Sequence, residues 1–176
     1  MKLSLTLRRS ALSAAVALAG AIAHSAEDSL PAQARAAMAR STAFMRSIAT
    51  EGGYLWRYSP ALKERAGENV APPPQIWVQP PGTPSMGMAF LRAHEVTGDP
   101  QYLDAAKAAA DALAVGQLES GGWYYLVEFD PALSAKWYRR TDVGKVSAAD
   151  AAKRRNVTTF DDDNTQSALR LLLAVA

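Results

Sequence analysis

The stretch that decides the fold is GGWYYLVEFDPAL at residues 121–133, because a related stretch, GGYLWRYSPAL, occurs at residues 52–62. The two align with a two-residue slip. Thr83-Pro84-Ser85 precedes an apolar helical pattern, and Thr165-Gln166-Ser167 does the same. Repeats of paired helices build solenoids or closed α/α toroids. We therefore predict a mainly α fold of antiparallel helix pairs with short aromatic β-hairpin insertions, arranged either as a solenoid or as an incomplete α/α toroid.

Apolar residues recur at helical spacing in four segments. Three of these segments cover residues 31–50, 83–98 and 101–118, and a fourth begins near Asp163. Trp123–Phe129 has the composition of a strand, and Trp137-Tyr138 is a candidate to pair with it. In a toroid, the loops before alternate helices meet at one mouth. We expect the loop at 79–82 and the loop at 158–163 to meet in this way.

Residues 1–26 have the pattern of a secretory signal peptide. Lys2, Arg8 and Arg9 precede a short apolar stretch, and small residues follow at a cleavage position. The full sequence holds 19 basic and 17 acidic residues. Without the three basic residues of the signal, 16 basic and 17 acidic residues remain, so the formal charge falls to −1. The basic character is therefore no argument for nucleic-acid binding, and we expect no membrane span after signal removal.

Residue types exclude several kinds of active site. The chain has no cysteine, and outside the signal its one histidine is His94. Thiolate nucleophiles and two-histidine metal sites are therefore excluded within this sequence, and a Ser-His-Asp triad would need His94. Catalysis would rest on Asp, Glu, Lys, Arg or Tyr. The last helix ends without a stop signal, so we expect residues 27–176 to be the N-terminal part of a longer catalytic domain, truncated at its C-terminus and inactive alone.

Asp161, Asp162 and Asp163 stand side by side where the last helix begins. Three adjacent carboxylates repel one another and need solvent, a helix N-terminus or a cation nearby. Oxygen ligands of this kind suit Ca²⁺ or Mg²⁺. A plain helix cap is the alternative, because aspartate is a favoured capping residue.

Residues 35–176 resemble the bacterial pectate lyases of the α/α toroid type, polysaccharide lyase family 10. The most specific part of the likeness is Thr159-Phe160-Asp161-Asp162-Asp163 with Thr165 and Leu169-Arg170. The other matching segments are Gly121-Gly122-Trp123-Tyr124-Tyr125 and Trp137-Tyr138-Arg139-Arg140.

The resemblance implies a Ca²⁺-dependent pectate lyase that cleaves polygalacturonate by β-elimination. It implies Asp161 as the main catalytic residue, with Asp161, Asp162 and Asp163 binding or supporting the Ca²⁺. The family's arginine base would come from beyond residue 176. The scarcity of histidine agrees with such chemistry.

Aromatic and basic residues near the aspartates are candidate substrate contacts. Aromatic rings stack on sugars, and arginines pair with uronate carboxylates. Packing in the core is the alternative for each aromatic residue, and a solvated charged surface is the alternative for each arginine. The substrate-binding candidates are Trp123, Tyr125, Trp137, Arg139, Arg140 and Arg155.

The function predicted from the sequence is a secreted or periplasmic bacterial enzyme that degrades pectate or a related uronate polysaccharide. The alternative from another class is a non-catalytic α/α carbohydrate-binding or scaffold protein, which the repeat and the aromatic residues fit equally well. Another toroid enzyme acting on uronate sugars is a third possibility.

Overall fold

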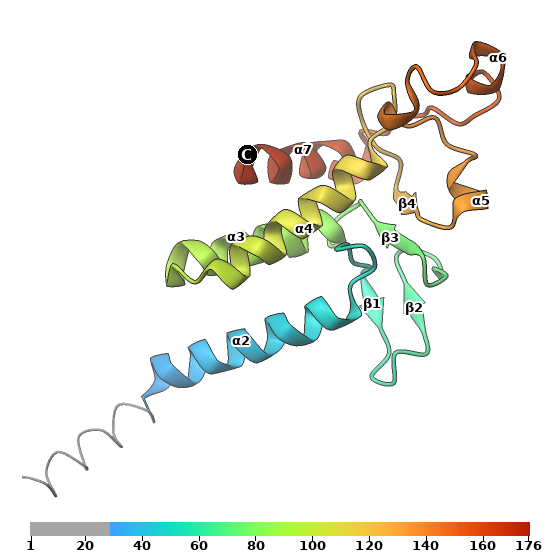
Figure 1. The fold of residues 1–176 in the computed structure, drawn as a ribbon. Helices are drawn as coiled ribbons and strands as arrows, with labels where there is room; N and C mark the ends of the chain where they lie inside the picture. Colours follow the sequence, from blue (N-terminus) through green and yellow to red (C-terminus); the bar gives the residue numbers. More distant parts are fainter. Residues whose placement is uncertain (1–28) are drawn as a thin grey trace, which may run out of the picture. The chain divides into compact units, whose positions relative to one another are not determined.

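The computed structural model describes residues 29–176, so the predicted signal peptide lies outside the described part of the chain. The chain divides into two compact units, residues 1–43 and 44–176. The first unit holds most of helix α2 (Leu30–Ile48), which has Pro31 in its first turn and is rich in alanine (Figure 1). The helix predicted over residues 31–50 is confirmed.

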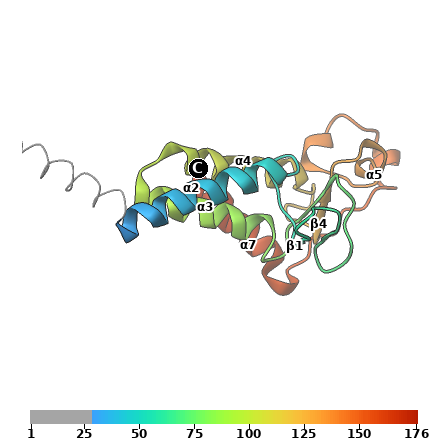
Figure 2. The same ribbon diagram turned by 90° about the horizontal axis from the view of Figure 1, so that it is seen from below.

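Three helices form the core of the second unit. Helices α3 (Thr83–Thr97) and α4 (Pro100–Gly116) form a hairpin, and α7 (Asn164–Val175) contacts both. Figures 1 and 2 show α7 beside this hairpin. A side-chain carbon on Gly87 would lie 2.2 Å from Leu171 Cδ2, so α3 and α7 approach closely because this residue is glycine. The three predicted helices are confirmed.

Two small antiparallel sheets lie at one end of these helices. Strand β1 (Arg57–Tyr58) pairs with β2 (Arg65–Ala66), and β3 (Gln75–Trp77) pairs with β4 (Leu126–Glu128). Short helical turns complete the unit: α5 (Pro131–Ser134), η1 (Arg140–Asp142), α6 (Ala148–Ala151) and η2 (Asp161–Asp163).

The strand predicted at residues 123–129 forms over a shorter range and with another partner. The prolines at 72–74 form a turn that leads into β3, in which Gln75 N donates to Pro72 O at 3.1 Å. Pro74 O accepts a hydrogen bond from Phe129 N at 2.8 Å. Strand β4 therefore pairs with β3, and Trp137 forms a parallel bridge with Arg155 instead. The expected pairing of residues 137–138 with this strand is wrong.

The two copies of the repeat make the same contacts. The Thr83 hydroxyl accepts from Tyr54 N at 2.9 Å and donates to Tyr54 O at 3.1 Å. The Thr165 hydroxyl makes the same pair of bonds with Trp123, at 3.1 and 3.4 Å. Each Gly-Gly-aromatic segment is thus tied to the start of a later helix in its own copy, α3 in the first and α7 in the second.

The prediction of a mainly α fold is confirmed for residues 29–176, which also hold two small antiparallel sheets, while the α/α toroid stays a prediction. Among the helices of this range, none combines the length and the apolar character needed to cross a membrane.

Tyr54 should make the stability of the protein sensitive to alkali. The side chain is 1% exposed, and burial raises its pKa from 10 to about 12, with Tyr58 adding to the rise and Arg46 opposing it. The folded state therefore holds the phenol proton more tightly than the unfolded chain does. This share of the stability is complete below pH 10 and is lost as the pH rises toward 12, amounting to roughly 2–3 kcal/mol.

Urea unfolding of the wild type and of Tyr54→Phe on either side of this pH range would measure the effect. The variant should lose less stability than the wild type between pH 10 and 12. An equal loss in both proteins would contradict the assignment to Tyr54.

Candidate functional site

The Asp161–Asp163 turn is the centre of the candidate site. Asp162 (φ 47°, ψ 39°) and Asp163 (φ 60°, ψ 22°) both have left-handed backbone conformations. Aspartate adopts this region more readily than most residues, because its short polar side chain bonds locally. Helix α7 starts directly after the turn, and all three carboxylates are exposed. Two successive left-handed residues keep the three aspartates out of a regular helical arrangement.

Each of the three carboxylates has a different partner. The Tyr125 hydroxyl donates to Asp161 Oδ2 at 2.9 Å, and Gln79 Nε2 donates to Asp162 Oδ2 at 2.7 Å. Asp163 forms an ion pair with Arg170. Within residues 29–176, no group of three or more His, Cys, Asp and Glu side chains could hold a metal ion. The Ca²⁺ site at Asp161, Asp162 and Asp163 stays a prediction.

Two tryptophans hold Gln79 in position. Trp77 Nε1 donates to Gln79 Oε1 at 3.2 Å, and Trp56 Nε1 donates to the Gln79 carbonyl at 2.8 Å. The two rings pack edge to face with centroids 5.9 Å apart. The loop at 79–82 thus meets the loop at 158–163, as expected from the sequence. Sequence reasoning did not single out Gln79 itself, because nothing marks a lone glutamine as a contact.

Tyr125 remains a hydrogen-bond donor over a wide pH range. A hydrogen bond with Thr159 acts to lower the pKa of Tyr125, while the bond to Asp161, desolvation and the negative charges of Asp161 and Asp162 raise it. The net direction is upward from 10. The phenol therefore stays protonated at neutral pH and keeps its bond to Asp161.

Trp123 lies in the core and is not a substrate contact. Its side chain is 0% exposed, and Nε1 donates to Leu113 O in α4 at 2.7 Å. The ring therefore has no free face for a sugar. The sequence prediction for this residue is wrong because it could not tell a core tryptophan from a surface one.

Arg139 is a buried structural residue, although it was predicted to bind substrate. Its side chain donates to Val115 O at 3.1 Å and to Glu128 O, joining the end of α4 to β4. Burial lowers the pKa of Arg139, and the charges of Asp142 and Glu128 oppose this shift. Both terminal nitrogens of the guanidinium are thus occupied, and its Nε is buried without a hydrogen-bond partner in the described structure. The neighbouring Arg140 is exposed, and no ion pair within residues 29–176 involves it.

Trp137 supports Arg155 rather than offering a stacking surface. Its side chain is 8% exposed, Tyr124 lies with its ring centroid 5.0 Å away, and Arg155 Cζ lies 5.5 Å from the Trp137 ring centroid. Tyr124 also contacts Tyr125, with centroids 5.1 Å apart. The prediction that Trp137 stacks on a sugar is therefore wrong. A continuous row of aromatic contacts nevertheless joins the Asp161 partner Tyr125 to the exposed Arg155.

No family model, curated protein or solved structure matches the chain.

Adjacent arginines provide a test of which basic residues are structural. Arg139→Ala should lower the free energy of unfolding by about 1.5–3 kcal/mol, because two carbonyls lose a charged donor. Arg140→Ala, its exposed neighbour, should change it by less than about 0.5 kcal/mol. Chemical denaturation of the two variants measures both values, and equal losses would show that Arg139 has no special structural role.

Proposed function

We propose that the protein is a Ca²⁺-dependent pectate lyase, or the N-terminal part of one, that cleaves polygalacturonate by β-elimination. The resemblance over residues 35–176 supports this function. The observation that carries it is the difference in the partners of the three carboxylates of the Asp161–Asp163 turn. Asp161 and Asp162 are held by neutral donors and take part in no ion pair within the described range, whereas Asp163 is neutralised by Arg170. Two exposed negative charges are therefore left for a cation.

The donor atoms of Asp161 and Asp162 fit Ca²⁺. Carboxylate oxygens are the ligands this hard cation prefers, and its six to eight positions leave room for water and for a substrate carboxylate. Asp163 supports the turn through Arg170 instead of binding the cation. When bound, Ca²⁺ supplies positive charge beside the uronate carboxyl group, where negative charge develops as the C5 proton leaves.

The chain's own residues position the cation site and the substrate. Tyr125 holds Asp161, and Gln79 holds Asp162, so both carboxylates keep fixed orientations. The exposed Arg140 and Arg155 are the basic side chains that pair with uronate groups along the polymer. The C5 proton goes to a base outside the residues assigned here, and the 4-linked sugar departs as a double bond forms between C4 and C5.

The proposed fold and location follow from the same function. The helices α3, α4 and α7, with the repeated threonine contacts, support an arrangement of the α/α toroid kind. Polygalacturonate is a polymer that stays outside the cell. We therefore propose a secreted or periplasmic enzyme, in agreement with the signal pattern at residues 1–26.

Full-length protein should release unsaturated oligogalacturonates from polygalacturonate when Ca²⁺ is present. The new double bond is conjugated with the carboxyl group and absorbs in the near ultraviolet, so a continuous absorbance assay follows it. EDTA should abolish the reaction, and added Ca²⁺ should restore it. Binding of the polymer without any product would favour the non-catalytic carbohydrate-binding alternative.

The two kinds of aspartate in the turn should respond differently to substitution. Asp161→Asn and Asp161→Ala should each lower kcat/KM by roughly 10²–10³-fold, because the charge facing the cation is lost while the exposed side chain adds little to folding. Asp163→Asn is the matched control, since its charge is already paired with Arg170. Turnover of Asp161→Asn near the wild-type value at saturating Ca²⁺ would show that the site is elsewhere.

A further inference from the structure

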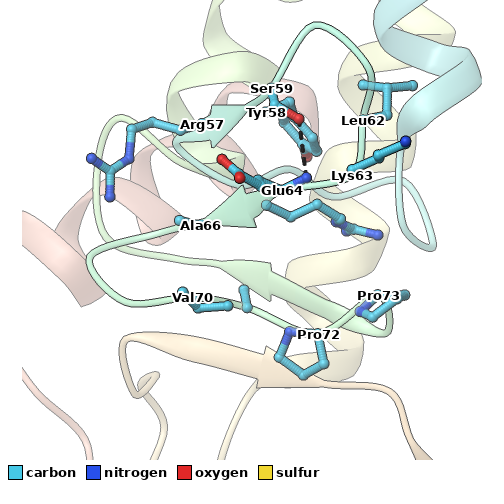
Figure 3. Close-up of a pocket in the computed structure, with 12 residues that line it drawn as sticks. Arg57, Tyr58, Ser59, Leu62, Lys63, Glu64, Ala66, Val70, Pro72 and Pro73 are labelled. Atoms are coloured by element: carbon cyan, nitrogen blue, oxygen red, sulfur yellow. Dashed lines mark hydrogen bonds between the residues drawn. The ribbon is translucent and has the colours of Figure 1, made fainter.

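A cavity lies beside the β1–β2 hairpin and shares no residue with the aspartate site. Its volume is about 840 Å³, within the range of small-molecule binding sites. The hairpin and the segment Val70–Pro73 line it. Figure 3 shows Leu62 and Lys63 on the hairpin side, with Val70 and Pro72 across the cavity.

The lining of this cavity carries an excess of positive charge. Arg57, Lys63 and Arg65 line it together with a single acidic residue, Glu64. None of the ion pairs within residues 29–176 involves any of these four side chains. The net positive charge of this lining favours anions, and no ion pair within residues 29–176 would have to break for one to bind.

Arg65 is the cation best placed to bind an anion. Its Nη2 donates to Thr50 Oγ1 at 2.8 Å, and its Cζ lies 5.7 Å from the Tyr58 ring centroid. These two contacts fix the guanidinium plane. Its Nε is buried and has no hydrogen-bond partner in the described structure. The guanidinium therefore keeps a fixed orientation at the cavity wall, where a ligand carboxylate can pair with its positive charge.

The apolar part of the lining selects among anions. Leu62 and Val70 are exposed hydrophobic side chains, 40% and 88% accessible, and Pro72 lies beside them in the lining. An inorganic anion would leave this surface in water, whereas the body of an organic acid would cover it.

We propose that this cavity binds an organic carboxylate, whose carboxylate group contacts Arg65 and whose body lies against Leu62, Val70 and Pro72. The site is independent of the function proposed for the aspartates.

Calorimetric titration of the full-length protein with benzoate, benzamide and inorganic phosphate tests the chemical class. Benzoate should bind, and its uncharged counterpart benzamide should bind at least about tenfold more weakly, the value of one charged hydrogen bond. Phosphate should also bind more weakly than benzoate. Equal binding of benzoate and benzamide, or tighter binding of phosphate, would overturn the proposal.

Variants test the place of binding. Arg65→Gln should weaken benzoate binding by at least about tenfold. Arg92→Gln, on the exposed face of α3, is the matched control and should bind as the wild type does. A folded Arg65→Gln protein with unchanged affinity would overturn the assignment.

A second pair of variants does not depend on the folding of Arg65→Gln. Val70 lines the cavity and is 88% exposed, so charge can be added there without disturbing the core. Val70→Glu should weaken benzoate binding, and Val70→Lys should strengthen it. Equal affinities of these two variants would show that benzoate does not bind in this cavity.

Discussion

The paired hydrogen bonds of two threonine hydroxyls hold this structure together. Thr83 and Thr165 are buried, and each accepts from the N–H and donates to the C=O of one aromatic residue, Tyr54 or Trp123. A hydroxyl is suited to this because it is both donor and acceptor. Buried backbone groups that no sheet or helix pairs need such partners. The threonines therefore allow irregular Gly-Gly-aromatic segments to enter the core beside the helices.

The candidate site depends on the same anchoring. Trp123 O accepts from Thr159 N at 2.9 Å and from Asn164 Nδ2 at 3.1 Å, so one residue fixes the chain before and after the aspartate turn. Left-handed conformations at non-glycine residues cost of order 1–3 kcal/mol each. Two of them in succession persist here because both ends of the turn are bound to the core. Trp123 thus serves the site from inside the protein, although its ring never faces a ligand.

The sequence predicted what depends on periodicity and repetition. The helices, the repeat and the meeting of the loops at 79–82 and 158–163 all follow from local pattern and from the order of elements. It did not predict the roles of Trp123 and Arg139, because a tryptophan or arginine has the same letter whether it fills the core or faces solvent. The sequence also did not predict the pairing of β4 with β3. Strand β3 lies about 50 residues before β4 in the chain, and tertiary packing sets the pairing.

Asp161 and Arg65 carry opposite charges, and each is contacted by a tyrosine that packs against the same hydrophobic cluster. Leu55, Ala71 and Trp77 form its buried part, and Tyr58 and Tyr125 pack against it. Tyr125 binds Asp161, whereas Tyr58 lies under Arg65. Neither Asp161 nor Arg65 takes part in an ion pair within residues 29–176, and exposed ion pairs add little to stability. By binding each charge through a neutral aromatic side chain, the fold orients Asp161 and Arg65 while leaving their charges uncompensated.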